Sequence, residues 1–590
     1  MISVGSSEQT RGPSAFKGPG RGGWTVLALA LFAVGTGLRF APILAAGPDR
    51  YVPSDANLER ETLDTWRYLT EGDITYGTWL VSRNARALLE HPLDFFESLH
   101  CTPLPQAVTL GIPAVAMGVL AIPFTAFSDN PVLVYNAVLI SMSILACLAM
   151  YLLVREWTGV PLAAIVAGLL YGFSPLRLAA ITHPSQRDDI WTVFAIYFAY
   201  RLLVHARWRD ALGLAASFAM QATESFYPFL AAVIGIPPIL IWMLISQRLK
   251  KIRPLQVVLV AAIAVAVIVW MYPPYLDTRS GGMWSDRTGI QQFAPLAGYL
   301  PGGMSFPGFA VLVGTAAALL LGRRGLAHDF RGDPRLALLL SALLVAWFAA
   351  GPLPSMRYGT SIPDLYGTMA AFFPGLDSIR AVLRLDVGVY LALVILAGIG
   401  AAALVRCAGT RGAFAGCLLV ALTVVDLARP ASLGLEPRYE WVPLAIEAEP
   451  ETLEFFGELG ERGNRGPVLE LPFDYGNESF RLAPQRVLAT HYHGRKTSAC
   501  FGSFFPPIRH RLGLAAKHLP ETQAVEELHA LGFTTVIAHH PEAQRGFWRK
   551  RFLRESDGPG PHLAYLHGSA RHSAFQVVVP QPDPPPHPPE

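Results

Sequence analysis

The stretch TEGDITYGTW, residues 70–79, carries the acid Asp73 among glycine, threonine and aromatic residues. A carboxylate in such a position can accept the proton of an attacking hydroxyl group as a general base. Much later in the chain, Arg380 and Arg384 provide guanidinium groups, which bind phosphate bidentately and stabilise negative charge on a leaving group. These residue types suit the transfer of a group from a phosphate carrier to a hydroxyl. Spacing alone favours a plainer role for Asp73, as a turn or helix N-cap acid.

The composition places these residues in a membrane protein. Hydrophobic residues make up 52% of the 590 residues, charged residues only 15%, and the mean hydropathy is +0.36. A soluble chain of this length carries more charge. The formal net charge is +3 and the arginines fall mostly in short loops, which argues against nucleic-acid binding. No GxxxxGK[ST] loop or GxSxG elbow occurs, so nothing indicates a nucleotide-driven pump or a hydrolase triad.

Apolar runs predict about eleven membrane spans, each long enough to cross much of the roughly 30 Å of hydrocarbon. We place them at residues 24–46, 131–154, 160–181, 190–205, 211–223, 226–246, 255–276, 306–321, 336–350, 388–405 and 413–427. A cleaved signal peptide is the alternative for the first run, because a basic leader precedes it.

Residues 107–127 are also apolar, but Pro113 and Pro123 interrupt them. If this segment lies in the outer interface rather than crossing, the basic loops all fall on the cytoplasmic side, as the positive-inside rule requires. We therefore predict one interfacial or re-entrant helix here, a cytoplasmic N-terminus and an extracytoplasmic chain after about residue 428.

Ionisable residues concentrate near the outer ends of the predicted spans. Each alone could be a snorkelling arginine or a solvated loop acid. Together they indicate a polar cavity that opens outward, since a charge in hydrocarbon costs about 3 kcal/mol on insertion scales. The residues are Arg39, Asp73, Arg177, His183, Asp188, Asp189, Glu224, Arg279, Asp286, Arg380 and Arg384.

The composition changes after residue 430. Residues 450–473 and 520–540 each show a helical pattern, a glycine and a short apolar strand, which predicts a small α/β domain with a partly parallel sheet. The predicted organisation is a disordered cytoplasmic leader (1–23), a transmembrane domain (24–429) with a long outer loop (47–106), an extracytoplasmic α/β domain (430–579) and a proline-rich tail (580–590).

The cysteines and histidines give weaker signals. Five cysteines are scattered without a CxxC motif. Cys101 and Cys500 are both predicted outside, where a disulfide could form, but two unrelated buried thiols are the favoured interpretation. The histidines in 491–493 and 539–540 lack an acid or cysteine at matching spacing, so we assign no metal site to them.

Several segments, taken in order, resemble a known family. They are residues 72–105 (GDITYGTWLVSRNARALLEHPLDFFESLHCTPLP), 130–159, 163–191 (with GLLYGFSPLRL and HPSQRDDIW), 373–385 (FPGLDSIRAVLRL) and 491–507 (HYHGRKTSACFGSFFPP). The series is similar to bacterial multi-span proteins of the GT-C glycosyltransferase architecture. The resemblance covers most of residues 60–540.

This resemblance implies a mainly α, GT-C-like protein of the bacterial inner membrane. It implies an inverting transfer of sugar from a polyprenyl-phosphate donor to an extracytoplasmic glycan, lipid or protein. Asp73 would be the base, and Arg380 and Arg384 would bind the phosphate. Many GT-C enzymes carry acids close to the first span, so Asp49 and Asp55 are the alternative bases.

Other outer residues are expected to bind substrate as well. His183, with Asp188 or Asp189, occupies an outer turn where related transferases place a second acid or a metal ligand, and Glu224 lies at another outer end. A divalent cation is therefore an open possibility as cofactor. The alternative function is a non-catalytic transporter or assembly factor for lipid-linked glycans. A transporter is less favoured, because the sequence shows no internal repeat of two similar halves.

Overall fold

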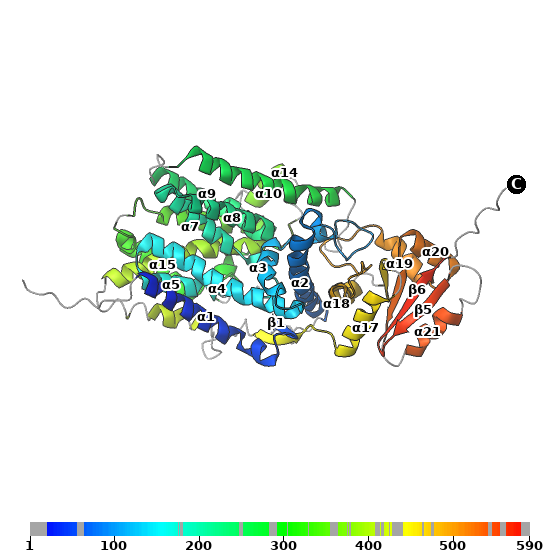
Figure 1. Ribbon diagram of the computed structural model, residues 1–590. Coiled ribbons are helices and arrows are strands. Elements are labelled where there is room, and N and C mark those ends of the chain that lie inside the picture. The colour runs from blue at the N-terminus through cyan, green and yellow to red at the C-terminus, as the bar shows by residue number, and fades with distance from the viewer. Residues whose placement is uncertain are drawn as a thin grey trace, which may run out of the picture.

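A computed structural model of the chain shows a bundle of helices joined to a small α/β domain (Figure 1). It describes residues 21–55, 64–174, 176–177, 181–246, 252–281, 292–301, 303, 305–328, 330–353, 364–373, 376, 379–407, 414, 418–423, 425–426, 441–462, 465–473, 477–540, 545–554 and 562–579. The predicted leader up to residue 20, the proline-rich tail, and the side chains of Asp55, Arg279 and Asp286 lie outside these residues.

The first part of the chain supplies the bundle. Its helices are α1 (Arg21–Ala46), α2 (Asp64–Glu90), α3 (Val115–Thr125), α4 (Pro131–Thr158), α5 (Pro161–Gly172), α7 (Ile190–His205), α8 (Trp208–Glu224), α9 (Phe226–Ser246), α10 (Pro254–Ser280), α11 (Phe309–Leu321), α12 (Arg335–Ala350), α14 (Leu365–Phe372) and α15 (Asp386–Cys407). Short 3-10 turns connect them, among them η2 (Pro92–Asp94), η3 (Ala107–Leu110), η4 (Pro184–Arg187), η6 (Leu296–Tyr299), η7 (Gly322–Gly325) and η9 (Val382–Leu385).

The chain is a polytopic helical membrane protein. The helices α1, α4, α5, α7 to α12 and α15 fall on predicted spans, and the last predicted span, 413–427, lies partly outside the described residues. In the described chain, 5 helices are long and apolar enough to cross a membrane: α1, α4, α9, α10 and the segment Val382–Cys407 that contains α15. Others are shorter: the 12 residues of α5 extend only about 18 Å at 1.5 Å per residue.

The interrupted segment at residues 107–127 folds as η3 followed by α3. The 11 residues of α3 are too few to span the hydrocarbon by themselves. This length agrees with the expectation that the segment does not cross as one helix.

The predicted outer loop, residues 47–106, is largely helical instead. Its 27-residue helix α2 contains Asp73, so the interpretation of Asp73 as a turn residue is wrong. Glycine and threonine suggested a turn, but the helix buries side chains on most of its circumference, including Ile74, Thr78, Trp79 and Asn84. Packing on two sides therefore outweighs the weak helix propensity of these residues.

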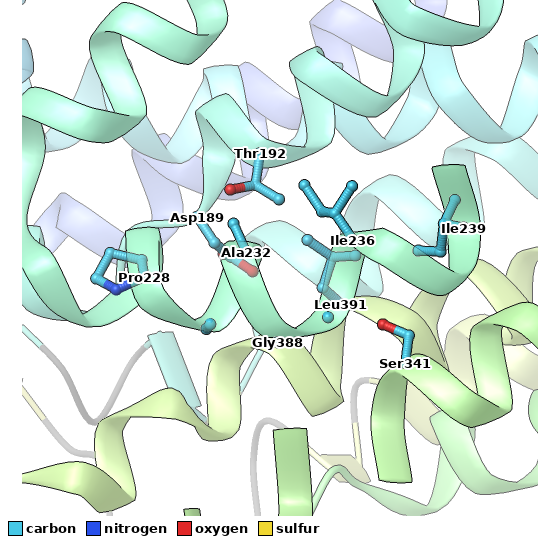
Figure 2. Close-up of a pocket in the computed structure, with 11 residues that line it drawn as sticks. Asp189, Thr192, Pro228, Ala232, Ile236, Ile239, Ser341, Gly388 and Leu391 are labelled. Atoms are coloured by element: carbon cyan, nitrogen blue, oxygen red, sulfur yellow. The ribbon is translucent and has the colours of Figure 1, made fainter. Parts of the chain in front are cut away.

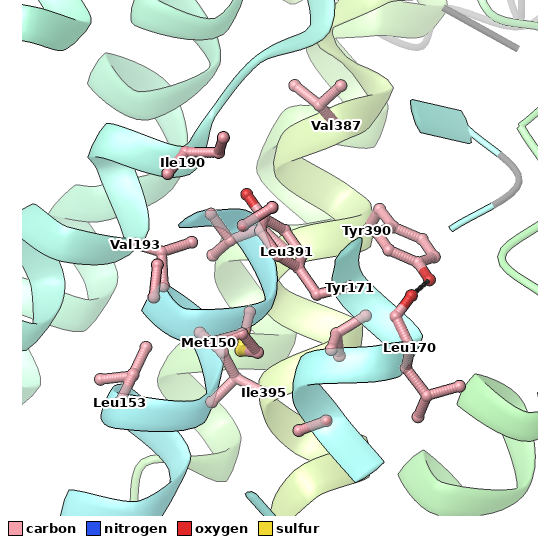
Figure 3. Packing of buried hydrophobic residues seen from close by; sticks show 14 of the residues in the cluster. Met150, Leu153, Leu170, Tyr171, Ile190, Val193, Val387, Tyr390, Leu391 and Ile395 are labelled. Atoms are coloured by element: carbon pink, nitrogen blue, oxygen red, sulfur yellow. Dashed lines mark hydrogen bonds between the residues drawn. The ribbon is translucent and has the colours of Figure 1, made fainter. Parts of the chain in front are cut away.

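The bundle core is built where α4, α5, α7 and α15 meet (Figure 3). Aliphatic side chains such as Leu153, Val193 and Ile395 interdigitate there, and all three are at most 1% exposed. The Tyr390 hydroxyl donates a hydrogen bond to the carbonyl oxygen of Leu170 at 2.6 Å, which satisfies a polar group between α15 and α5. This core supports the turn η4 and the start of α15, from which the candidate site is built.

The C-terminal domain contains β2 (Trp441–Ala445), α17 (Pro450–Glu461), β3 (Val468–Leu471), α18 (Asn477–His493), α19 (Arg509–His518), α20 (Thr522–Ala530), β4 (Thr535–His539), α21 (Arg545–Arg554), β5 (His562–Gly568) and β6 (His572–Val578). Its sheet has the order β3-β4-β6-β5. Strands β3 and β4 are parallel, as the two helix–strand units predicted, whereas β6 runs antiparallel to β4 and to β5.

A second, two-stranded sheet ties this region back to the first helix. Strand β1 (Tyr51–Asp55) pairs antiparallel with β2, and the guanidinium of Arg39 in α1 lies 4.0 Å from the ring centroid of Trp441 in β2. The helices α2 and α18 lie against each other between the bundle and the four-stranded sheet (Figure 1). The four-stranded sheet and the helix bundle therefore meet at the helix that carries Asp73.

Candidate functional site

Polar contacts fix helix α2 on both sides. The Trp79 indole donates a hydrogen bond to the Thr490 hydroxyl of α18 at 2.9 Å. On the other side, the Asn84 amide donates to the carbonyl oxygens of Pro113 and Ala114 at 2.8 and 3.1 Å. Gly118 of α3 permits this approach, because a Cβ there would lie 2.6 Å from that of Asn84. Asp73 is thus held on a rigid element rather than on a loop.

Asp73 is paired with His183. The Nε2 atom of His183 lies 2.6 Å from Oδ2 of Asp73, and its Nδ1 lies 2.8 Å from the hydroxyl oxygen of Thr182. The two side chains are 28% and 21% exposed, so the pair remains accessible. His183 immediately precedes η4, and this turn carries the imidazole to α2 from a segment far along the chain.

The electrostatic surroundings keep His183 neutral. Burial lowers the pKa of His183 below 6.5, the Asp73 carboxylate raises it, and the positive charges of Arg384 and Arg380 lower it again. With its Nε2 protonated, the neutral imidazole donates a hydrogen bond to Asp73. It therefore orients the carboxylate without neutralising it.

The two arginines reach the pair from the segment before α15. The Arg384 guanidinium lies 5.3 Å from the ring centroid of Tyr227 in α9. The backbone of this segment is pinned to Gln292: the Gln292 amide donates to the Arg380 carbonyl at 2.7 Å, and the Leu383 amide donates to the Gln292 carbonyl at 3.0 Å. The structure thus brings together four of the predicted site residues, namely Asp73, His183, Arg380 and Arg384.

Asp188 and Asp189 have partners within the protein. Both are almost fully buried, and the Arg177 guanidinium donates to Asp188 at 2.9 Å and to Asp189 at 3.2 Å. Asp188 also accepts the backbone amide of Ile190 at the start of α7. These contacts make the two acids counter-ions for a buried guanidinium, and their predicted substrate-binding role stays a prediction.

Glu224 lies at the end of α8 with its side chain fully buried. It accepts the backbone amide of Met117 at 2.9 Å, near the N-terminus of α3. A carboxylate there also complements the positive end of the helix dipole. Its substrate-binding role likewise stays a prediction, and its observed contact positions α3 against α8.

Sequence reasoning missed Arg187, which lies on η4 only four positions after His183. Its guanidinium lies 3.6 Å from the buried Asp386 at the start of α15. This ion pair joins η4 to the segment that carries Arg384. The signal was available in HPSQRDD, where the arginine precedes two acids, but its partner Asp386 is remote in sequence.

The alternative base Asp49 lies in the turn before β1, where its charge acts on Glu447. Its backbone carbonyl accepts a hydrogen bond from the side-chain amide of Asn130.

Within the described residues, no group of three or more His, Cys, Asp or Glu side chains is arranged to hold a metal ion. His491 and His493 lie at the end of α18, where the ring of His491 contacts the carbonyl of Asp129 and His493 is buried.

A narrow, mostly apolar crevice lies between α7, α9, α12 and α15 (Figure 2). One wall is α9, where Pro228, Ala232, Ile236 and Ile239 follow one another along the helix. These positions cover about 16 Å of helix length at 1.5 Å per residue. The lining residue at one end of this wall, Pro228, directly follows Tyr227, the ring beneath Arg384, and the crevice continues toward the middle of α9.

Cys101 and Cys500 form a disulfide, so the favoured interpretation of two unrelated thiols is wrong. Backbone hydrogen bonds surround it: the Cys101 amide donates to Ala499 at 2.8 Å and the Thr102 amide to Thr497 at 3.0 Å. The segment that follows α2 is therefore attached to the C-terminal domain both covalently and through its backbone.

Comparison with solved structures identifies the architecture. The chain superimposes on the arabinofuranosyltransferase AftD from Mycobacteria with a TM-score of 0.51 and 12% sequence identity, over 95% of this chain. The chain has a GT-C-like fold. It spans only 40% of the length of AftD.

A second structure similar to the GT-C-like chain is the archaeal oligosaccharyltransferase AglB from Archaeoglobus fulgidus, in complex with an inhibitory peptide and a dolichol-phosphate. The TM-score is 0.39 with 13% identity, over 96% of this chain and 75% of AglB. No family model matches the sequence, and no curated protein is similar to it in sequence.

Proposed function

We propose that the protein is a glycosyltransferase that moves a sugar from a polyprenyl-phosphate donor to an extracytoplasmic acceptor by inverting displacement. The observation that carries this proposal is the Asp73–His183 pair at 2.6 Å with Arg384 and Arg380 beside it. A base and two phosphate-binding cations at one place are the parts that such a transfer needs. The GT-C-like fold supports the same class of reaction by analogy.

The reaction assigns each group a task. An acceptor hydroxyl attacks the anomeric carbon from the face opposite the phosphate, and Asp73 takes its proton. The bond between the anomeric carbon and the phosphate oxygen breaks, and its electron pair stays on the lipid phosphate. Arg384 and Arg380 stabilise that charge, while neutral His183 holds the carboxylate in its attacking orientation.

The apolar crevice along α9 supports a lipid-linked donor. It is lined mostly by aliphatic and small residues, and its lining residue Pro228 directly follows Tyr227, whose ring lies under Arg384. A phosphate at Arg384 would place the first part of a prenyl chain at its entrance. Its polar lining residues are Asp189, Thr192 and Ser341 (Figure 2).

The disulfide supports an outward-facing site. Disulfides persist in oxidising compartments, and Cys101–Cys500 joins the segment after α2 to the C-terminal domain. We therefore place α2, the candidate site and the C-terminal domain outside the bacterial inner membrane, with the N-terminus in the cytoplasm. The positive-inside pattern of the basic loops supports the same orientation.

Mass spectrometry of cell-envelope glycans and lipids, with and without the gene, tests this function. We expect one sugar mass to be lost without the gene and restored by the wild-type protein. Asp73→Asn should express and insert normally but restore no product, whereas Asp49→Asn should restore it. Full product from Asp73→Asn would contradict the catalytic role and favour a transporter or assembly factor. The same assay with and without EDTA tests the divalent cation that the sequence leaves open.

A further inference from the structure

The C-terminal domain exposes a basic helix that the proposed chemistry does not use. Helix α21 reads RGFWRKRFLR, with five basic residues and no acid in 10 positions. Phe552 anchors it, since its side chain is 1% exposed and packs 4.9 Å from the ring of Phe575 in β6. Arg549, Lys550 and Arg551 are exposed, and so is Phe547, at 55%.

Aromatic rings hold two of these guanidinium groups. The Arg549 guanidinium lies 4.6 Å from the ring centroid of Tyr565 in β5, and that of Arg551 lies 5.9 Å from the centroid of Trp548. A guanidinium stacked on a ring keeps N–H groups at its edge, and its planar fork is already ordered for a carboxylate or phosphate. The α21 surface, defined as Phe547 to Arg551 with Tyr565, thus combines ordered cations with aromatic faces.

These cations differ from other exposed arginines of the same domain. Arg462 lies 3.1 Å from Glu458, and Arg571 lies 3.9 Å from Glu449. Within the part of the chain that the structure describes, no carboxylate lies within ion-pair distance of Arg549, Lys550 or Arg551, and Arg551 instead donates to the Leu519 carbonyl at 3.4 Å. The described part of the domain therefore leaves the positive charge of the α21 surface available to a ligand.

We propose that the α21 surface binds an anionic glycan chain. Sugar rings present C–H faces that pack on aromatic side chains, and carboxylate or phosphate groups on such a chain match the guanidinium forks. Helix α21 lies at the end of the C-terminal domain remote from the helix bundle (Figure 1), which favours an extended polymer over the bilayer surface as the ligand. This inference goes beyond the proposed function, which leaves the acceptor open, and it rests on the proposed external orientation.

Binding by the full-length protein in nanodiscs of neutral lipid tests the inference. The probes are polygalacturonate for carboxylate, a phosphomannan for phosphate, and neutral dextran. We expect one or both anionic glycans to bind, more weakly as salt increases, and dextran not to bind. The double variant Arg549→Gln/Lys550→Gln should bind about tenfold more weakly, since each exposed charge contribution is modest.

A matched control removes the same charge elsewhere on the domain. Arg462→Gln/Arg571→Gln should leave binding unchanged, and an equal loss in this control would overturn the site. Equally tight binding of single-stranded DNA, or preferential binding to anionic lipid vesicles, would overturn the glycan assignment. Binding is also measured in Asp73→Asn: retained binding by this inactive variant separates glycan recognition from the transfer reaction, so either proposal can fail alone.

Discussion

His183 and Asp73 are 110 positions apart in the chain, yet Nε2 of one lies 2.6 Å from Oδ2 of the other. The contact joins helix α2, held against the C-terminal domain, to turn η4, held by the bundle core. A carboxylate on a helix with its imidazole partner on a separate rigid turn is positioned from two directions. This arrangement suits a base that must face one particular hydroxyl.

Replacing His183 should slow the transfer without unfolding the protein. His183→Gln keeps a donor for Asp73 and should be slowed less than His183→Ala, for which we expect a loss on the order of 100-fold. Because burial and the two arginines lower the pKa of His183, wild-type activity should decline only in acid, below the ordinary pKa range of a histidine. This acid limb should disappear in His183→Gln. If both variants kept the wild-type rate and the wild-type pH profile, the proposed role of His183 would be contradicted.

Arg384 should affect the donor rather than the acceptor. We expect Arg384→Gln to raise the KM for the polyprenyl-phosphate sugar by about tenfold or more, because a charge-assisted hydrogen bond to phosphate is lost. Arg384→Lys should be intermediate, since it keeps the charge but loses the planar fork. The control is Arg86→Gln, a partly exposed arginine of α2 paired with Asp129. If the variant raised only the KM for the acceptor, Arg384 would instead be assigned to acceptor binding.

Local patterns predicted the parts of the fold that depend on neighbouring residues. The helix–glycine–strand order around Pro450 and Thr522 gave α17, β3, α20 and β4, and the parallel pairing of β3 with β4. The pairing of β1 with β2 was missed, because its residues are separated by nearly the whole membrane domain. Such long-range pairing is decided by tertiary contacts that no short window contains.

The site was predicted in its residue types but not in its partners. Asp73, His183, Arg380 and Arg384 were named from outer-end positions and a family resemblance, and the structure groups them. Asp188 and Asp189 were read as outward-facing because the turn that carries them is polar. Their burial depends on Arg177, which lies 11 and 12 positions earlier, and no rule of spacing pairs these groups across a turn.

The disulfide predicts a distinct labelling pattern. After denaturation without reductant, an alkylating reagent should modify Cys147 and Cys407, which are free, but not Cys101 or Cys500. Reduction should make the last two reactive. Alkylation of Cys500 before reduction would contradict the disulfide.

The same topology predicts where the C-terminal domain lies. A reporter enzyme that works only outside the cytoplasm should be active when it is fused after Pro430, because the proposed orientation places both disulfide cysteines outside. The same reporter fused before α1 should be inactive, because the proposed orientation places the N-terminus in the cytoplasm. Cytoplasmic activity of the Pro430 fusion would reverse the orientation and remove the external acceptor from the proposal.

Acid should destabilise the C-terminal domain through its buried histidines. Burial lowers the pKa of His493 from 6.5 to about 4; Glu470 raises it, and Arg495 and His539 add to the lowering. Between pH 6.5 and 4 the unfolded state therefore binds more protons than the folded state, and the free energy of unfolding falls as the pH falls. From pH 7 to pH 5, His493 alone accounts for about 2 kcal/mol.

The pKa of His491 is lowered to about 4 by burial, Arg86 adding to the lowering, so it contributes in the same direction. Scanning fluorimetry of the full-length protein at pH 7 and pH 5 measures the effect as a lower Tm in acid. His493→Gln removes the group that titrates, so the Tm difference between the two pH values should shrink, whatever the variant does to stability at pH 7. An exposed control, His518→Gln, should keep the wild-type difference. If His493→Gln keeps it too, the pKa of His493 is nearly the same in the folded and unfolded states, and its ring must be hydrated rather than buried between α18 and the sheet.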